Sequence, residues 1–316
     1  MKKDISDELK LHSKNKIEMT RALLFISLLF SCGLSIAQVD LSGFNYFQKT
    51  DYNMKVAESN TYKNGTLFQK LVIDGFDSKV PFFLIKPKSD KEDRFVFLLH
   101  GINGSKNDWI YPMTSLCEKY IKLKDSLLTL GYSLIIPDAK YHGERSYEAN
   151  FTSPLSFYSS QDIQKAYNLF STTVKDIRII MDYIEYRSAN TTVAFDVIGY
   201  SMGGVLAIYL NSIDNRLNKV VACVAPLNAK KSSMRIGMNE KNAEQLASTS
   251  PKSYAHLQKA PITLLMGKKD GWYTENEAQD FFSKITIPDK SLKFYDAGHY
   301  LPEGFISDAI KVIIEE

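Results

Sequence analysis

The chain has few cysteines, with three among its 316 residues. Cys32 lies in an N-terminal segment that differs in character from the rest, whereas Cys117 and Cys223 fall in an expected helix and an expected buried strand. This usage does not imply a disulfide framework, even in an oxidising compartment. Internal repeats and low-complexity tracts are also missing. The length therefore suits one globular domain with a large core.

The sequence also lacks an excess of charge. Its 39 basic and 36 acidic residues give a formal net charge of +3. Residues 1–37 hold six of the basic and four of the acidic side chains, which leaves 33 against 32 in the remainder. That remainder contains basic pairs, such as Lys230-Lys231 and Lys268-Lys269, but no basic tract. Nucleic acid is therefore not an expected partner.

The apolar run at residues 22–30 is too short to span a membrane. It follows Arg21 and leads into small residues that end at Ala37, an order typical of a secretory signal peptide. We expect translation to start at Met19, cleavage to follow Ala37, and the mature protein to be secreted or periplasmic. A lipid anchor on Cys32 is the alternative, although the preceding residue suits lipoprotein processing poorly.

The most informative motif is Gly-Tyr-Ser-Met-Gly at residues 199–203. It follows an apolar, β-branched run at 192–198 and precedes a helical pattern at 204–210. A strand, a tight turn and a helix in this order predict a nucleophile elbow that exposes Ser201. The amide of Met202, at the start of the new helix, can then donate to an oxyanion. An ordinary strand-to-helix turn is the alternative.

Three further segments supply the other parts of a hydrolase site. A buried strand at 94–99 leads into His-Gly-Ile-Asn-Gly, where the amide of Ile102 is the expected second oxyanion donor. A strand at 261–267 is followed by Asp270, and a strand that begins at Leu292 leads to His299. The order Ser201, Asp270, His299 is that of nucleophile, acid and base in the α/β-hydrolases.

With these motifs the sequence resembles the α/β-hydrolase superfamily over roughly residues 66–316. After a strand at 132–138, the segment Asp-Ala-Lys-Tyr-His-Gly-Glu-Arg-Ser is similar to a loop of small bacterial carboxylesterases and dienelactone-hydrolase-like proteins. The resemblance implies an α/β-hydrolase fold with a mainly parallel eight-stranded sheet, helices on both faces and a short cap insertion. The alternation of strands and helices independently favours a mainly parallel sheet.

The expected elements place the remaining segments in one domain at residues 38–316. Further strands are expected at 66–74, 80–86 and 219–226, and helices at 113–130, 171–187 and 302–314. Two insertions, near 143–170 and 227–256, follow the carboxyl ends of strands, where ligands bind in α/β folds. We expect them to form the substrate side, although most of their aromatic residues are expected to pack the insertions on the body of the domain.

Several residues compete for the catalytic roles. Asp296 is an alternative acid, but it lies in the last strand, only three residues before His299. His100 is expected to shape the oxyanion loop, and His142 to tie a loop together with Glu144 and Arg145 through charge-assisted hydrogen bonds.

Asp138 and His142 together also allow a metal site, which no further Cys or His spacing supports. No metal or cofactor is expected. Asn103 stands in an Asn-x-Ser sequon, where a glycan would obstruct the oxyanion loop, so we expect a bacterial origin.

The pattern as a whole predicts a secreted serine hydrolase that cleaves a small carboxylic ester through an acyl-enzyme intermediate. A small-molecule ester or an acylated saccharide is the expected substrate, but its acyl and alcohol parts and the residues that bind them cannot be read from the sequence. One alternative is a serine peptidase of the acylaminoacyl or prolyl type without the usual propeller. Another is a catalytically silent binding protein on the same scaffold.

Overall fold

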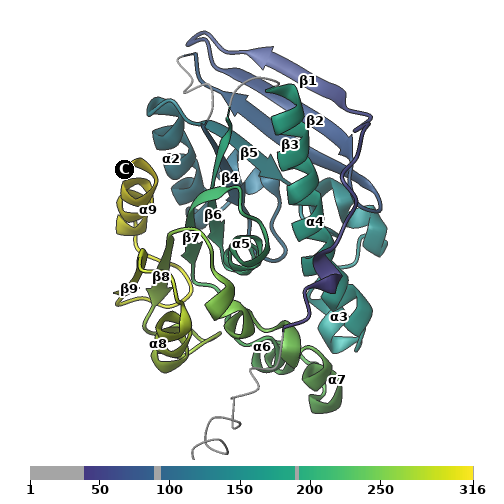
Figure 1. Cartoon of the computed structure of the whole chain (residues 1–316), viewed down its shortest axis with the longest axis vertical. Coiled ribbons are helices and arrows are strands. Elements are labelled where there is room, and N and C mark those ends of the chain that lie inside the picture. The colour runs from purple at the N-terminus through teal and green to yellow at the C-terminus, as the bar shows by residue number, and fades with distance from the viewer. Residues whose placement is uncertain (1–38, 89–93, 189–191, 316) are drawn as a thin grey trace, which may run out of the picture. The chain divides into compact units, whose positions relative to one another are not determined.

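The computed structural model describes residues 39–88, 94–188 and 192–315. The expected signal peptide at 1–37 lies outside these residues. Residues 41–316 form one compact unit around a nine-stranded sheet (Figure 1). In spatial order the strands are β1 (Lys55–Thr61), β2 (Leu67–Asp74), β3 (Lys79–Lys86), β5 (Ser133–Pro137), β4 (Arg94–Leu99), β6 (Ala194–Tyr200), β7 (Leu217–Cys223), β8 (Ile262–Gly267) and β9 (Lys290–Tyr295).

The sheet is parallel where the site lies. β5, β4, β6, β7, β8 and β9 run parallel to one another, whereas β1, β2 and β3 form an antiparallel edge that joins β5 through β3. Because parallel strands end at one edge, the loops after β4, β6 and β8 gather there. The central strands are buried on both faces, and the exposed fraction of Val96 and Phe97 is 0%. This burial explains their unbroken apolar sequences.

The fold class is the expected α/β-hydrolase-like one, but the sheet has nine strands instead of eight. The additional strand is β1, in which all seven residues are exposed. Neither face of β1 is buried, so its sequence shows no alternation of apolar and polar residues. Pairing of its backbone with β2, for example Lys55 with Val72, holds it in place. A strand held mainly by its backbone leaves no alternating side-chain pattern to detect.

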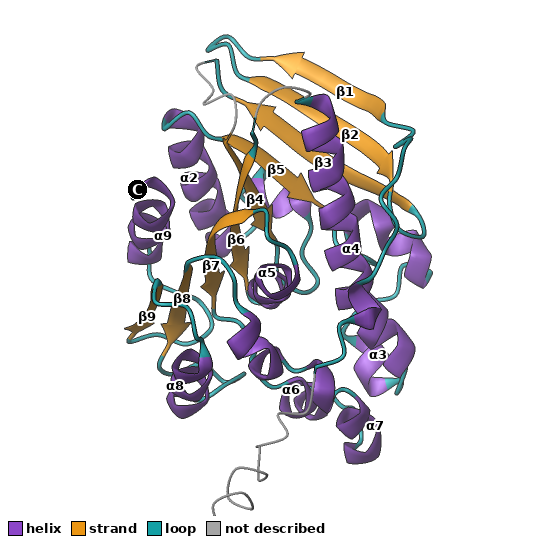
Figure 2. Cartoon of the chain, in the orientation of Figure 1, coloured by secondary structure: helices purple, strands orange, loops and turns teal. Residues whose placement is uncertain are grey.

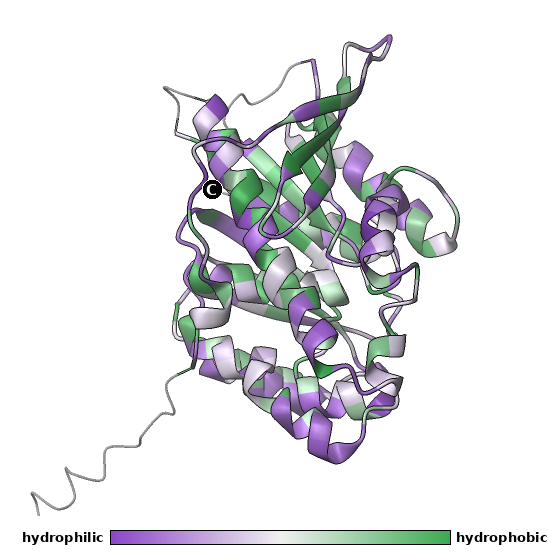
Figure 3. Cartoon of the chain, turned by 90° about the vertical axis from the view of Figure 1, so that its right-hand side faces the viewer, coloured by the Kyte–Doolittle hydropathy of each residue, from purple (hydrophilic) through white to green (hydrophobic). Residues whose placement is uncertain are grey.

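Helices cover both faces of the sheet, as Figure 2 shows, with α2 and α9 on one face and α4 and α5 on the other. In Figure 3 the strands in the interior are mostly hydrophobic, whereas the helices carry both kinds of residue. The helices are α2 (Ser115–Thr129), α3 (Ser156–Ser159), α4 (Ile163–Arg187), α5 (Met202–Ile213), α6 (Ala229–Arg235), α7 (Glu240–Gln245), α8 (Glu275–Lys284) and α9 (Gly304–Ile314).

The two predicted insertions contribute short helices near the edge of the sheet where the parallel strands have their carboxyl ends. The segment after β5 contains a 3-10 helix, η3 (Gly143–Ala149), and α3. It then enters α4 at Ile163, earlier than the start at 171 that the sequence suggests. The side chain of Asp162 caps this start by accepting a hydrogen bond from the amide of Lys165. The segment after β7 supplies α6 and α7.

Candidate active site

Ser201 sits in a strained turn between β6 and α5. Its φ of 56° and ψ of −115° lie in a region that residues other than glycine rarely adopt. Its amide donates to the carbonyl of Cys223 at 2.8 Å. A Cβ atom on Gly199 would lie 2.0 Å from the Gly203 carbonyl oxygen, and one on Gly203 would lie 2.2 Å from that of Leu99. The elbow therefore requires glycine at both positions.

The three predicted catalytic side chains lie in one hydrogen-bonded chain. Ser201 Oγ is 2.8 Å from His299 Nε2, and His299 Nδ1 is 2.8 Å from Asp270 Oδ2. The second oxygen of Asp270 accepts the Trp272 amide at 2.9 Å. The carboxylate is fully buried, whereas 22% of the His299 side chain is exposed. This geometry fits an imidazole that donates from Nδ1 and accepts the serine proton at Nε2.

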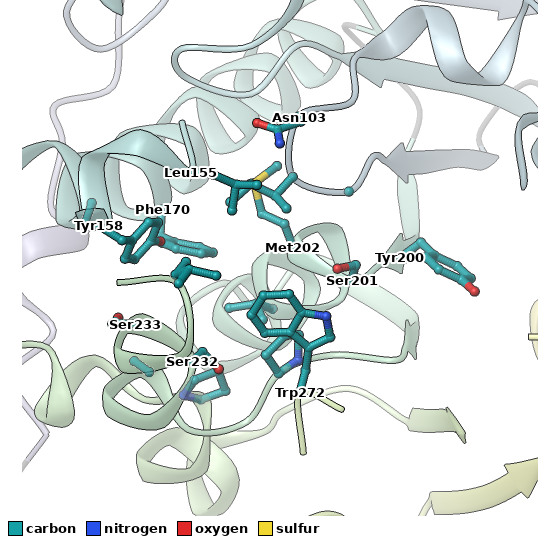
Figure 4. Close-up of a pocket in the computed structure, with 18 of the residues that line it drawn as sticks. Asn103, Leu155, Tyr158, Phe170, Tyr200, Ser201, Met202, Ser232, Ser233 and Trp272 are labelled. Atoms are coloured by element: carbon teal, nitrogen blue, oxygen red, sulfur yellow. The ribbon is translucent and has the colours of Figure 1, made fainter. Parts of the chain in front are cut away.

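Tyr200 holds the loop that carries His299. Its hydroxyl donates to the His299 carbonyl at 2.8 Å and accepts the Leu301 amide at 2.9 Å. Burial raises the pKa of Tyr200, so the hydroxyl keeps its proton and remains a donor. Figure 4 shows its side chain pointing away from Ser201. In the sequence this residue is only the variable position of the motif, and nothing local indicates its role.

The competing histidines are bonded elsewhere. His100 Nδ1 lies 2.8 Å from the Gly101 carbonyl, and its Nε2 accepts the Ala139 amide at 3.2 Å. His142 Nδ1 lies 2.8 Å from the Lys140 carbonyl. Burial lowers the pKa of both imidazoles, to about 3 for His142. The structure thus places both rings in loop packing. His142 was expected to join Glu144 and Arg145 through charge-assisted hydrogen bonds, but its lowered pKa keeps the ring neutral, and its Nδ1 bonds to the Lys140 carbonyl instead.

Asp296, the alternative acid, lies at the surface. Its side chain is 76% exposed, and its carboxylate pairs with Lys269 Nζ at 2.7 Å. The charge of Lys269 lowers the pKa of Asp296 through this hydrogen bond. Between the two candidate acids, the structure therefore brings Asp270 to the imidazole.

The two predicted oxyanion donors lie beside Ser201. Ile102 and Met202 both line the same cavity as the serine. The first helical hydrogen bond of α5 runs from Val205 to the Ser201 carbonyl, so the Met202 amide precedes the helical ladder. A Cβ atom on Gly101 would lie 3.6 Å from the Cβ of Ser201, so the loop after β4 passes close to the serine.

Asp138 holds the loop that follows β5 by accepting hydrogen bonds from Lys106 and Glu144. Its Oδ1 accepts the Lys106 amide at 2.9 Å, and its Oδ2 accepts Lys106 Nζ at 2.6 Å and the Glu144 amide at 3.0 Å. Lys106 is completely buried, which its sequence context did not indicate. Among the residues that the structure describes, no cluster of three or more His, Cys, Asp or Glu side chains could hold a metal ion.

Arg145 ties the same loop to α4. The sequence predicts that Arg145 stabilises a loop, but not that its partner lies on α4. Its guanidinium, fully buried, lies 2.8 Å from Asp176 and 3.0 Å from Glu148. Burial alone would lower the pKa of Arg145, but the two carboxylates raise it and keep the side chain charged. These bonds fix the segment that leads into the first insertion.

A cavity of about 330 Å³ opens at Ser201 (Figure 4). Both insertions line it, the first through Leu155, Tyr158, Tyr167 and Phe170, and the second through Ala229, Ser232, Ser233, Ile236 and Leu246. Phe44, from the start of the described chain, also lines it and was not expected there. Its size and its largely apolar walls are those of a small-molecule site.

The amino-acid sequence matches the dienelactone hydrolase family over residues 84–307. The chain belongs to this family. The matched range runs from β3 into α9 and includes Ser201, Asp270 and His299. No curated protein matches the chain in sequence. Family membership confirms the predicted resemblance and supports an ester-cleaving hydrolase.

Solved structures of esterases share the fold. Acetyl xylan esterase 1 from Thermoanaerobacterium is 17% identical with a TM-score of 0.67, over 89% of this chain and 93% of that one. An esterase of Pyrococcus furiosus is 20% identical with a TM-score of 0.59, over 85% and 98%. A cold-adapted esterase from an Arctic intertidal metagenomic library is 16% identical with a TM-score of 0.58, over 81% and 97%. At these identities the likeness concerns the fold alone.

Proposed function

We propose that this dienelactone hydrolase family member is a secreted serine hydrolase that cleaves a small carboxylic ester through an acyl-enzyme intermediate. The observation that carries the proposal is the chain of two 2.8 Å contacts from Ser201 through His299 to Asp270. A serine hydroxyl is a weak nucleophile until a base within hydrogen-bond reach takes its proton. The cavity beside Ser201 gives a substrate access to this nucleophile.

In the first half of the proposed reaction, Ser201 Oγ attacks the ester carbonyl while its proton passes to His299 Nε2. Asp270 stabilises the imidazolium through Nδ1. The carbonyl oxygen becomes negatively charged and accepts hydrogen bonds from the amides of Ile102 and Met202. When the carbon–oxygen bond to the alcohol breaks, His299 returns the proton to the departing oxygen. The alcohol leaves, and the acyl group remains on Ser201.

The second half repeats these steps with water. His299 takes a proton from a water molecule as its oxygen attacks the acyl carbonyl, and the same two amides bear the oxyanion. The bond to Ser201 Oγ then breaks, and His299 returns the proton to the serine. A carboxylic acid is released, and the enzyme regains its initial state.

The proposed location and substrate rest on different support. Secretion, into the periplasm or beyond a bacterial cell, is supported by the signal-like sequence at residues 1–37, with a lipid anchor on Cys32 as the alternative. Among the described residues, no helix is both long enough and apolar enough to cross a membrane. A small-molecule ester or an acylated saccharide suits the dimensions of the cavity.

The proposal is tested with short-chain 4-nitrophenyl esters and a fluorophosphonate probe. The wild-type protein should hydrolyse the esters and form a probe adduct on Ser201. Ser201→Ala should lower kcat by about 10⁴-fold or more, because the members of a triad act as a unit. Faster cleavage of aminoacyl-4-nitroanilides would instead favour a peptidase. A folded protein that forms no adduct and turns over no ester would be a binding protein.

A matched pair of aspartate substitutions tests the acid. Asp270→Asn should lower kcat by about 10⁴-fold, because the amide favours the wrong imidazole tautomer. Asp296→Asn makes the same chemical change at an exposed site and should leave kcat unchanged. Melting temperatures of both variants control for folding. Equal activity of the two variants would contradict the assignment of Asp270.

A further inference from the structure

The cavity follows one stripe of α5 away from the nucleophile. Ser201, Val205 and Tyr209 are spaced by four residues, so they lie on the same face of the helix, and all three line the cavity. At 1.5 Å per residue, this stripe extends about 12 Å from Ser201 to Tyr209. A group attached to a carbonyl carbon that is bound at Ser201 can therefore extend along this part of the cavity, which we call the channel.

Aromatic side chains close the far end of this channel. The ring of Phe44 lies 5.5 Å from that of Tyr209 and 6.1 Å from that of Tyr254, and only 6% of Phe44 is exposed. Phe170, on α4, lies 6.0 Å from Tyr209. The segment before Phe44 also fits tightly, because a Cβ atom on Gly43 would overlap the hydroxyl of Tyr167. The channel is thus a closed pocket of limited length.

The walls suit an uncharged, apolar occupant. None of the described residues that line the cavity is Asp, Glu, Lys or Arg. Figure 4 shows Leu155, Tyr158 and Phe170 grouped on the side of the cavity away from Trp272, with Met202 between them and Ser201. An apolar chain in such a pocket is removed from water, whereas an acetyl group would leave most of the volume of about 330 Å³ unfilled.

The direction of proton transfer decides which half of an ester enters the channel. His299 must reach the departing alcohol oxygen, so the alcohol lies on the side of His299. There Trp272 and Tyr300 flank the imidazole, each with its ring centre 6.2 Å away. Tyr300 is 69% exposed, so this side opens to solvent. The acyl group then points the other way, along Val205 and Tyr209.

We propose that the closed channel along α5 is the acyl pocket and that the preferred substrates carry a medium-length apolar acyl group, such as octanoyl. The alcohol stays at the mouth, between Trp272 and Tyr300. This inference rests on the proposed function, since it takes Ser201 as the nucleophile and His299 as the proton donor. It adds the acyl class, which the sequence alone does not reveal.

The test compares 4-nitrophenyl acetate, butanoate and octanoate, which share one leaving group. Burial of each added methylene can improve binding by up to about fourfold. We expect kcat/KM to be at least about tenfold higher for octanoate than for acetate, mainly through a lower KM, because the acyl chain binds alike in the ground state and the transition state.

Two substitutions should shorten the channel. Val205→Phe places a ring between Ser201 and Tyr209, and Ala166→Leu enlarges a small side chain that lines the cavity. Each should lower the ratio of octanoate to acetate kcat/KM by about tenfold or more. Ala247→Leu adds the same leucine at a partly buried site outside the lining and should leave the ratio unchanged. Melting temperatures show which variants fold. If only one of the two channel variants folds, that variant alone is enough for the comparison.

The outcomes separate this inference from the proposed function. If acetate is hydrolysed but octanoate is the poorer substrate, the acyl pocket is wrong while the serine hydrolase stands. The acyl pocket is equally wrong if folded Val205→Phe and Ala166→Leu both keep the wild-type ratio. If no ester is hydrolysed at all, the proposed function fails and the acyl pocket with it.

Discussion

Histidines 100, 142 and 299 all lie in loops that follow strands, yet their surroundings differ. His299 is partly exposed and has a carboxylate on one side and a hydroxyl on the other. His100 and His142 are buried, and their ring centres lie 5.1 Å apart. Two cations at that separation would repel each other in a medium that solvates charge poorly. Their burial therefore favours neutral rings, which act as fixed hydrogen-bonding groups instead of bases.

This burial predicts how stability depends on pH. The pKa of His142 is about 3 in the folded protein and about 6.5 in the unfolded chain. As pH falls below 6.5, the unfolded chain takes up a proton that folded His142 refuses, so the free energy of unfolding decreases until about pH 3. Between pH 7.5 and 5 we expect His142 to contribute a loss of about 2 kcal/mol.

Denaturant unfolding of His142→Asn at these two pH values measures the contribution. The asparagine amide can still donate to the Lys140 carbonyl but does not titrate, so the loss should be smaller than in the wild type by about 2 kcal/mol. An unchanged slope in His142→Asn would show that the ring is already accessible to protons in the folded state.

At the scale of elements, Lys106 joins three segments around the oxyanion loop through ion pairs with Asp138 and Glu144. Lys106 belongs to the 3-10 helix η2 (Lys106–Trp109), which follows that loop. Asp138 follows β5, and Glu144 lies in the first turn of η3. Neither Lys106 nor Asp138 is exposed. A buried pair adds little to stability compared with apolar packing, but the loss of one partner leaves a charge without compensation.

Lys106→Met should therefore lower the free energy of unfolding by about 3–5 kcal/mol, because the buried carboxyl group of Asp138 loses its partner. Lys122→Met removes a lysine whose ion pair with Glu303 is exposed, and it should leave the free energy of unfolding almost unchanged. Urea unfolding at neutral pH compares the two variants. A similar small loss in both would mean that water reaches Asp138 once the lysine is gone.

Across the whole molecule, the sequence revealed those parts of the fold that leave a local pattern. β4, β6 and β8 are short apolar runs because both of their faces are buried. β1 escaped prediction because its side chains are exposed, and its position depends on hydrogen bonds that any sequence can form. The early start of α4 also went unseen, since its first turns face the cavity and carry aromatic residues that resemble an insertion.

The residues of the candidate site also differ in whether they leave a local pattern in the sequence. The arrangement of Ser201, His299 and Asp270 could be predicted because the geometry of the elbow demands glycines at 199 and 203, and because the acid and the histidine each lie shortly after the end of a strand. Lys106, Tyr200 and Phe44 could not, since each acts through residues distant in the sequence. The strands β1 to β6 lie between Phe44 and Tyr209 in the sequence.

Phe44 lies in an N-terminal segment that packs on helices far along the chain. Arg178 donates to its carbonyl at 3.0 Å, and nearby Tyr46 donates to Asp182 at 2.7 Å. Phe44→Ala should lower the free energy of unfolding by about 3 kcal/mol, since a buried ring is lost beside an existing cavity. It should also open the far end of the acyl channel. We therefore expect the preferred ester to change from octanoate towards dodecanoate.

Phe47, three residues further on, is the matched control because 96% of its side chain is exposed. Phe47→Ala should change neither the free energy of unfolding nor the preferred acyl length, because its ring is already in water. Urea unfolding and the series of 4-nitrophenyl esters are measured on both variants. If Phe44→Ala loses stability but keeps the wild-type preference, this segment only braces the fold. A change in preference as well would mean that the segment sets the length of the acyl group, because its ring is the end wall of the channel.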